Sequence, residues 1–349
     1  KYTGKANSSK QYACSLNGWY KEEAYTNIVT SASKVTTASN HTLYAKWNNP
    51  SVTLETPVRA GYTFDGWYTD ESLKTKAGNG GASYSIGANT TLYAKWIANT
   101  DTKYTVVHKK MNLDGTYPEG NSPIAGKVEV VEKAGTTDSN VTPETNTYTG
   151  FTAPEKQTVT IKGDGTRVIK LYYARTSGTL KTVAGENIES VTVQNSVKYY
   201  YGATVPSLTA KTMTIEGHTV TFSKWTSNNE TYVKSSTVNP YGSFTWPAIP
   251  DGTSITLTAS ASKTPNKYEV TYKDVVGSTT GKVLGTSKEN VNFGTQVTGA
   301  SKGTDVTVGK YYAGYVYSSA TTATVTTSGA TVYRIFTAYD KTKYTVEHY

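Results

Sequence analysis

The sequence is poor in the residues on which most catalytic and metal sites depend. Of its 349 residues, one is cysteine and four are histidine. The single cysteine, Cys14, can form no internal disulfide, and it has neither a partner histidine nor a helix start nearby. The sequence also contains no paired carboxylates, nucleophile elbow, phosphate-binding loop or metal-ligand cluster. These absences predict a protein that is not an enzyme and that needs no metal or cofactor.

Charged residues are also scarce, at 17% of the chain, and the formal net charge of +9 comes almost entirely from lysine. Only four arginines occur, and no basic run is longer than Lys109-Lys110. A nucleic-acid surface needs clustered basic residues, so we expect no nucleic-acid partner. Dispersed lysines instead favour solubility and protect exposed sheet edges from pairing. No apolar stretch approaches the length that spans a bilayer, so no membrane insertion is expected in this segment.

Helical periodicity is rare, whereas tyrosine, with 29 residues, is abundant. The best short helix candidates are residues 22–25 and 71–75, and each follows a Gly-Trp-Tyr strand directly. Val159 and Ile161 alternate with polar residues, and a Gly-Asp-Gly turn leads into a second β-forming run at 168–173. This pattern predicts a β-hairpin. The fold class expected is therefore mainly β, or α+β at most.

Tandem repetition organises the chain. Trp19 recurs as Trp67 after 48 residues, and Trp47 recurs as Trp96 after 49, each within matching Gly-Trp-Tyr and Leu-Tyr-Ala-Lys-Trp segments. A near-constant period that carries the same bulky residues is typical of small repeated modules.

A longer repeat has an offset of 164 residues. Lys103-Tyr104-Thr105-Val106 recurs as Lys267-Tyr268-Glu269-Val270, and Gly150 recurs as Gly314. We expect the same offset to hold through the last hairpin, with Leu171 matched to Ile335. The unit restarts at Lys343, and both ends of the chain suggest a piece of a longer protein.

The repeats divide the chain into modules joined by linkers of two to four residues, which would restrict the motion between modules. The expected modules are 1–48 (shortened at its N-terminus), 49–100, 101–177, 178–264 and 265–341, with the start of a further repeat at 342–349.

Three of these patterns resemble repeats of bacterial surface proteins. Gly61-Tyr62-Thr63-Phe64-Asp65-Gly66-Trp67-Tyr68-Thr69-Asp70, followed by Thr91-Leu92-Tyr93-Ala94-Lys95-Trp96, resembles the internalin B-repeat, or Listeria–Bacteroides repeat. Residues 13–47 resemble a second copy, in which Ala13 and Cys14 replace Gly61 and Tyr62. Residues 179–262 resemble a divergent form of it, and residues 103–175 and 267–341 resemble mucin-binding-protein-like repeats. The resemblance implies tandem, small, β-grasp-like modules in an elongated array on a secreted, wall-attached adhesin-like protein of a Gram-positive type.

The repeated tryptophans are predicted to be structural anchors, because a residue that recurs in every module is more often core than ligand platform. They are Trp19, Trp47, Trp67, Trp96 and Trp225. Trp246 is unique, which makes it the candidate for stacking on a sugar, although its position before Pro247 favours the core.

Other recurring residues are interpreted as structural. His108 and His348 occupy the same repeat position and are predicted to be half-exposed strand residues without a metal. Lys103, Lys267 and Lys343 recur at a first strand, where an isopeptide bond to asparagine would stabilise a small module. No matching asparagine recurs near the last strand.

The resulting functional prediction is a non-enzymatic stalk segment on the outside of a bacterial cell, which projects a binding head. Two alternatives remain open. The modules could themselves bind host or environmental glycan or mucin, or like chains could associate through sheet edges into filaments.

Overall fold

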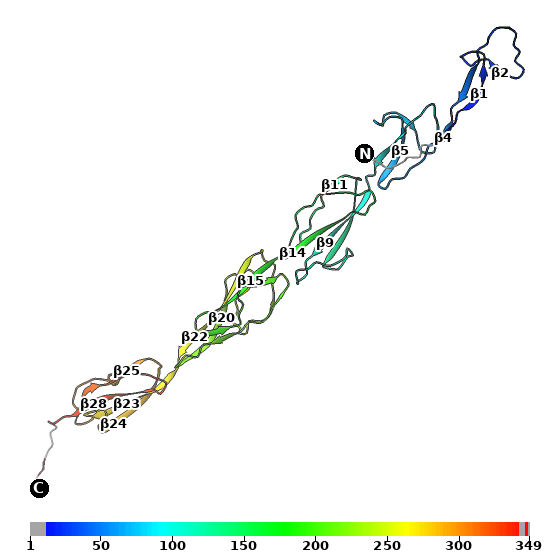
Figure 1. Ribbon diagram of the computed structural model, residues 1–349. Coiled ribbons are helices and arrows are strands. Elements are labelled where there is room, and N and C mark those ends of the chain that lie inside the picture. The colour runs from blue at the N-terminus through cyan, green and yellow to red at the C-terminus, as the bar shows by residue number, and fades with distance from the viewer. Residues whose placement is uncertain (1–11, 342–345, 348–349) are drawn as a thin grey trace. The chain divides into compact units, whose positions relative to one another are not determined.

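The computed structural model describes residues 12–341 and 346–347. The part of the chain that it describes is nearly all β-strand, with a single short 3-10 helix and many small sheets. The chain divides into two compact units (Figure 1). The first comprises the described residues up to Met111 with Tyr117–Asn146 and Ala153–Tyr173, and the second comprises Asn112–Thr116, Thr147–Thr152 and the described residues from Ala174 onward. The mainly β fold class is confirmed.

The strands of the first unit belong to small sheets of two to four strands. They are β1 (Ser15–Tyr20), β2 (Ile28–Val29), β3 (Tyr44–Asn48), β4 (Ser51–Thr53), β5 (Tyr62–Tyr68), β6 (Lys76–Gly78), β7 (Ser83–Ser85), β8 (Tyr93–Ala98), β9 (Thr102–Lys110), β10 (Val128–Gly135), β11 (Asn140–Val141), β13 (Val159–Thr160) and β14 (Val168–Arg175), the last two residues of β14 belonging to the second unit. The sheets β2-β1-β3 and β6-β5-β8 are antiparallel and repeat one arrangement.

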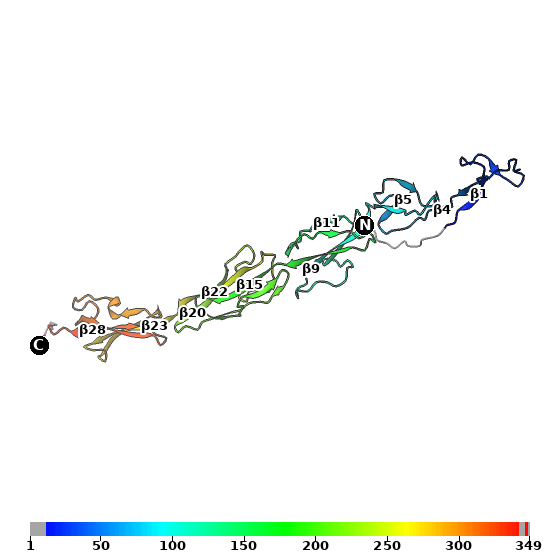
Figure 2. The same ribbon diagram turned by 45° about the horizontal axis from the view of Figure 1, so that its top comes forward.

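Residues 101–173 are built around a parallel pair of strands, β9 and β14, which are the first and last long strands of this stretch (Figure 2). β14 alternates buried and exposed side chains, and its buried residues are Ile169, Leu171 and Tyr173. β10 pairs antiparallel with β9, while β11 and β13 form a separate two-stranded sheet. The buried faces of β9 and β14 therefore carry the core of this stretch.

The hairpin predicted across residues 158–173 is wrong. Val159 in β13 pairs with Val141 in β11, and β14 pairs in parallel with β9 instead. The turn at Gly165 exists, with φ +72°, but it carries the chain from the two-stranded sheet to the main sheet. The alternation did identify the inward face, since Ile161 is fully buried. Alternation fixes which face of a strand is buried, and it does not fix the partner strand.

The second unit contains two four-stranded sheets and three two-stranded sheets. Its elements are β12 (Phe151–Thr152), β15 (Ser177–Ala184), β16 (Ile188–Val191), β17 (Val197–Tyr200), β18 (Thr204–Val205), β19 (Ala210–Thr212), β20 (His218–Ser227), β21 (Phe244–Thr245), β22 (Thr253–Pro265), β23 (Lys267–Val276), β24 (Val283–Asn292), β25 (Gln296–Thr298), the 3-10 helix η1 (Gly299–Lys302), β26 (Tyr315–Ala320), β27 (Thr322–Thr324) and β28 (Ala330–Ala338). The sheets β17-β15-β22-β20 and β24-β23-β28-β26 each have a parallel central pair, β15 with β22 and β23 with β28.

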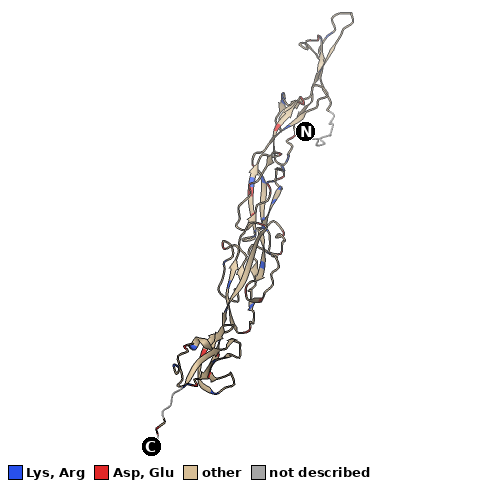
Figure 3. Ribbon diagram, turned by 90° about the vertical axis from the view of Figure 1, so that its left-hand side faces the viewer, with Lys and Arg blue, Asp and Glu red and all other residues tan. Residues whose placement is uncertain are grey.

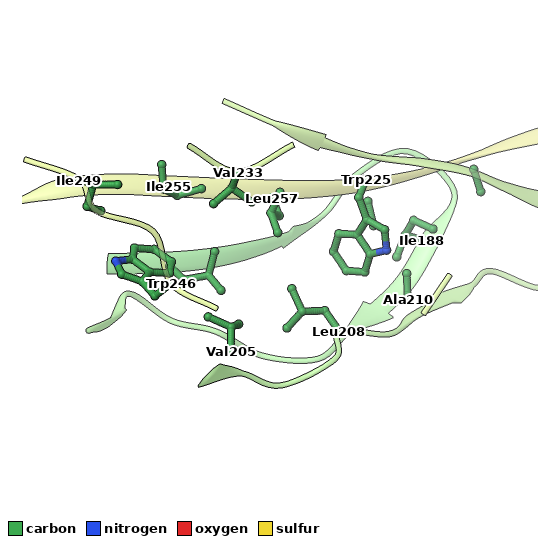
Figure 4. Packing of buried hydrophobic residues seen from close by; sticks show 13 residues of the cluster. Ile188, Val205, Leu208, Ala210, Trp225, Val233, Trp246, Ile249, Ile255 and Leu257 are labelled. Carbon is green, nitrogen blue, oxygen red and sulfur yellow. The ribbon is translucent and has the colours of Figure 1, made fainter. Parts of the chain in front are cut away.

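The largest hydrophobic core lies in residues 178–264. Ile255 and Leu257 on β22 point into it, and Trp225 and Trp246 enter the same interior from separate segments (Figure 4). Both tryptophans are fully buried. The alternation predicted for residues 255–259 is confirmed, because Ile255, Leu257 and Ala259 are buried while the residues between them are half-exposed.

Two further expectations differ from the structure. Residues 22–25 and 71–75 form turns, not short helices, and Tyr25 and Leu73 adopt φ values of +54° and +55°. A turn needs only a few local hydrogen bonds, whereas one helical turn of this length has no neighbouring turn to propagate into.

The 164-residue register also changes near the end of the long repeat. Leu171 pairs with His108, and Val332 pairs with Tyr272, so Leu171 corresponds to Val332, at an offset of 161. The turn before β28 is three residues shorter than the turn before β14, and this length difference shifts the register. The β-grasp-like description remains a prediction: the parallel central pair is present, but a two-stranded sheet stands where a helix was allowed for.

No helix in the described part of the chain is long and apolar enough to cross a membrane. Basic and acidic residues are interspersed along the ribbon rather than collected in one basic stretch (Figure 3).

Candidate functional sites at the module junctions and in a polar hollow

A glycine followed by an aromatic ring recurs at the start of one strand in each of four modules. In each case the strand pairs antiparallel with the last strand of its module. The pairs are Gly61-Tyr62 at β5, Gly150-Phe151 at β12, Gly217-His218 at β20 and Gly314-Tyr315 at β26. All four glycines have positive φ, between +67° and +78°. A side chain there would be strained, because L-residues rarely adopt this region.

The glycine carbonyl accepts a hydrogen bond from a residue that we call the linker residue, which follows the last strand of the module or stands at its end. The donor–acceptor distances are 2.9 Å for Asn99 N to Gly61 O, 2.9 Å for Thr176 N to Gly150 O, 2.8 Å for Asn266 N to Gly217 O and 2.9 Å for Tyr339 N to Gly314 O. The linker residue is thereby fixed to the module that precedes it.

At three of these places the carbonyl of the linker residue also accepts from the next stretch of chain. The donors lie just beyond the edge strands β10, β17 and β24, and their N···O distances are 2.9 Å for Thr137 to Asn99, 2.9 Å for Tyr201 to Thr176 and 2.8 Å for Phe293 to Asn266. One linker residue therefore bridges two segments through both of its backbone polar groups. We call each such bridge a junction.

Side chains close each junction around the glycine. A Cβ on Gly217 would overlap the Phe293 ring, one on Gly150 would overlap the Tyr201 ring, and one on Gly61 would overlap the backbone of Gly163. Only glycine therefore fits both the backbone conformation and the packing.

The aromatic residue beside the glycine adds a second contact. The rings of His218 and Phe293 meet edge-to-face at 5.5 Å. Phe151 meets Tyr201 in the same way at 6.0 Å. Tyr62 donates from its hydroxyl to Asp138, and Arg59 lies over the Tyr62 ring at 3.6 Å. Edge-to-face pairs of this kind are worth about 0.5–1.5 kcal/mol beyond their burial.

The first module departs from this pattern. Ala13 and Cys14 stand where the second module has Gly61 and Tyr62, and the Cys14 side chain is exposed. Sequence reasoning noticed these substitutions and the recurrence of the glycines, but it did not connect them with the junctions. The available signal was a glycine-aromatic pair at the same place in otherwise different modules.

A separate feature is a polar hollow of about 490 Å³ in the first unit. It lies over β9 and β10 and is bordered by the loop after β11; its polar lining includes His108, Glu129, Lys133, Glu144 and Asn146. The wall of the hollow presents acidic, basic and amide groups together. Such a mixture can both donate and accept hydrogen bonds, as a polyhydroxylated ligand requires.

His108 lies in the floor of this hollow and is only 4% exposed, although it was predicted to be half-exposed. Its Nδ1 is 2.8 Å from the Tyr173 hydroxyl, which accepts from the Asn146 N–H at 2.8 Å. Burial lowers the pKa of His108, and Lys133 adds to this effect while Glu129 opposes it. The ring is therefore neutral at pH 7, with one nitrogen that donates and one that accepts.

The corresponding place in residues 265–341 is filled. Tyr272 stands at the position of His108, and its hydroxyl donates to Glu289 at 2.5 Å. Lys302 donates to the same carboxylate at 3.2 Å and lies 4.4 Å above the Tyr272 ring. Two copies of one repeat thus differ in whether this space is open or occupied.

Residues 265–341 also contain a buried ion pair. Arg334 donates from Nε to Asp274 at 2.8 Å and from Nη2 to the other carboxylate oxygen at 2.7 Å. Tyr312 donates to Asp274 at 2.6 Å, and burial together with this bond raises the pKa of Tyr312 to about 12. Nη1 of Arg334 donates to the Lys302 carbonyl at 2.5 Å. Because each charge is paired and hydrogen-bonded, the cluster is a structural clamp.

The six tryptophans occupy different environments. Trp225 and Trp246 are fully buried, whereas Trp19 and Trp47 are 47% and 57% exposed. Trp67 and Trp96 are half-buried, both pack against Phe64, and the Trp67 Nε1 donates to the Glu55 carbonyl at 2.7 Å. The anchor role remains a prediction for the repeated tryptophans. Trp246 stacks on Tyr199 at 5.3 Å inside the core, so neither face is available to a sugar.

Within the described residues, no group of three or more His, Cys, Asp or Glu side chains could hold a metal ion. Lys103 and Lys267 have exposed side chains at the first strands. Lys343 and His348 lie outside the described residues.

Comparison with known protein families gives one match. Residues 7–46 and 48–95 match the Listeria-Bacteroides repeat domain, in two consecutive copies. The tandem repetition read from the tryptophan spacing is therefore confirmed for this part of the chain. A comparison with curated proteins gives no match.

Several solved structures are similar to parts of the chain. The Bacillus anthracis TIE protein is 11% identical, with a TM-score of 0.30, over 77% of this chain and 56% of that one, so this chain spans little more than half the length of that structure. Streptococcal High Identity Repeats in Tandem (SHIRT) domains 3–4, from a cell surface protein, are 14% identical with a TM-score of 0.25, over 47% of this chain and 98% of theirs. The pilus adhesin SpaC of Lactobacillus rhamnosus GG is 9% identical with a TM-score of 0.17, over 73% of this chain and 46% of that one.

Proposed function

We propose that this chain is a non-enzymatic stalk segment of an adhesin-like protein on the outside of a bacterial cell, and that it holds a binding head away from the surface. The observation that carries the proposal is the junction, in which one linker residue is hydrogen-bonded to the chain on both sides. A spacer needs little else than modules that keep their distance and direction.

The junctions supply resistance to bending without a large interface. Each contains two backbone hydrogen bonds, which contribute on the order of 1 kcal/mol each. A bend at Gly217 would break these bonds and separate Phe293 from His218. A Gly/Ser-rich linker would leave such motion free. The Listeria-Bacteroides repeats at the N-terminal end further support an extracellular, surface-attached role.

Small-angle X-ray scattering tests the stalk. A compact protein of this length would have a radius of gyration of about 20 Å, and we expect a value nearly twice as large. The measurement should be made at several concentrations, because growth with concentration would instead favour filaments formed through sheet edges. A concentration-independent value near 20 Å would contradict the stalk.

Glycan binding is the second candidate, and the open hollow beside His108 favours it. The filled copy in residues 265–341 provides an internal control. If the hollow binds saccharide, titration with mucin-type oligosaccharides should shift the amide resonances of Glu129 and Asn146 and leave those of Tyr272 and Glu289 unchanged. Glu129→Gln should weaken these shifts. Shifts spread evenly over both copies, or none at all, would argue against a site here.

A further inference from the structure

The end of residues 265–341 presents half of a junction. Gly314 has φ +78°, its carbonyl accepts from the Tyr339 N–H at 2.9 Å, and Tyr315 begins the adjacent strand β26. These are the features found at Gly61, Gly150 and Gly217. At those three glycines an added Cβ would overlap a covering group, whereas at Gly314 it would meet no described atom within 4 Å.

We propose that Gly314, Tyr315 and Tyr339 form a docking surface for a further module of the same class, placed after Tyr339 in the chain. This inference rests on the proposed stalk function and specifies how the stalk continues. The partner is defined by the three completed junctions, which share a first strand, an antiparallel edge strand and a covering residue just beyond that edge strand.

The covering residue is expected to be aromatic. Gly314-Tyr315 lies 164 residues after Gly150-Phe151, and Gly150 is covered by Tyr201. An aromatic side chain delivered to Gly314 would contact the glycine face and meet the Tyr315 ring edge-to-face, as Tyr201 meets Phe151. Its backbone N–H would bond to the Tyr339 carbonyl, as the Tyr201 N–H bonds to Thr176.

The chain offers its own module for the experiment. Residues 177–264 follow the linker residue Thr176, so attaching a second copy of them directly after Tyr339 reproduces the sequence context of an existing junction. We expect amide hydrogen exchange in residues 265–339 to slow by at least about fivefold relative to the unextended chain, since two hydrogen bonds and a ring contact are gained.

Two variants and one control separate docking from a general effect of extension. Gly314→Ala, or Tyr201→Ala in the added copy only, should remove the slowing. Gly277→Ala is the matched control: Gly277 has φ +77° and an open surrounding, so the strain is the same while the proposed surface stays intact. In the unextended chain, Gly314→Ala and Gly277→Ala should have similar effects on exchange.

The proposal is overturned if exchange in residues 265–339 is the same with and without the added module, or if Gly277→Ala abolishes the slowing as fully as Gly314→Ala does. Slowing that depends on protein concentration would indicate docking between separate chains and would also overturn it. The stalk function is tested independently by scattering from the unextended chain, so either proposal can fail alone.

Discussion

Residue type alone does not decide the role of tryptophan in this protein. Trp225 is surrounded by the core of residues 178–264, where its neighbours include Ile188 and Leu257 (Figure 4). Trp19, which occupies the equivalent repeat position in the first module, is 47% exposed. The difference follows from the amount of chain available to cover the ring, because a small module has few side chains to place over a large indole.

Trp225→Ala should therefore destabilise residues 178–264 by about 3–5 kcal/mol, the usual cost of truncating a buried aromatic to alanine. Trp19→Ala should have a much smaller effect, since nearly half of its side chain already contacts water. Chemical denaturation monitored at probes within each module would measure both. Equal losses for the two variants would show that exposure does not control the contribution of this residue.

Tyr312 leads to a prediction about high pH. Its pKa is raised to about 12 by burial and by the hydrogen bond to Asp274, so folding favours the protonated phenol. The stabilisation is fully present below the ordinary tyrosine pKa of about 10 and is lost as the pH rises through the folded value.

The difference in unfolding free energy between the native protein and Tyr312→Phe should thus shrink between about pH 10 and pH 12. Comparing the two proteins cancels the titration of the other tyrosines. Tyr317→Phe, in the same region but without a bond to Asp274, serves as the control. A difference that stays constant across this range would mean that the Tyr312 hydroxyl does not titrate in the expected direction.

At the scale of the element, the sequence predicted inward faces better than it predicted strand partners. The alternation at Val159 and Ile161 gave the correct face, and the hairpin inferred from it was wrong, because β14 pairs with the distant strand β9. Local turn signals report where the chain turns. They do not report that burying Leu171 beside a parallel strand is more favourable than pairing with the strand just before it.

The junctions were missed for a related reason. Each is made by a glycine, a linker residue and a covering residue that lie up to about a hundred residues apart in the sequence. Gly150 and Gly314 were matched as repeat positions, but the covering ring of Tyr201 belongs to a different type of module. Repeat comparison aligns equivalent positions within modules and carries no direct information on contacts between unlike ones.

Gly217→Ala tests the junction as an element. The substitution introduces strain at φ +67° and also pushes a methyl group into the Phe293 ring. Gly277→Ala introduces the same backbone strain with no such overlap. We expect Gly217→Ala to cost more, by roughly 1–3 kcal/mol, which is typical of overpacking.

Phe293→Ala in the Gly217→Ala background should recover part of that loss, because the ring that obstructs the methyl group is then absent. Thermal unfolding of the four proteins completes a double-mutant cycle. Additive effects of the two substitutions would indicate that Gly217 and Phe293 do not interact.

At the scale of the whole molecule, the modules share a repeat logic but differ in the size of their cores. Residues 178–264 bury a cluster that includes Leu180, Trp225 and Leu257. Among the described residues before Thr102, the buried hydrophobic side chains are Tyr20, Leu54 and Tyr68. The period of the sequence predicted that modules exist, and it could not predict this inequality, since it depends on which side chains the loops bring over each sheet.

Local stability should follow this inequality along the chain. Opening free energies scale with the apolar surface that each cooperative unit buries, so amide exchange should be slowest around Leu180 and Leu257 and fastest in residues 12–48. Residues 49–100 should be better protected than residues 12–48, because their glycine-aromatic pair is part of a completed junction while the first module has Ala13 and Cys14 instead. Gly61→Ala should bring protection in residues 49–100 closer to that of the first module, through the loss of packing against Gly163. Hydrogen exchange followed by mass spectrometry resolves these segments, and chelator added to the same samples should leave every segment unchanged, since no metal-ligand cluster occurs among the described residues. A uniform exchange rate across all modules would show that they unfold as one body, and that the junctions couple them more strongly than their individual cores stabilise them.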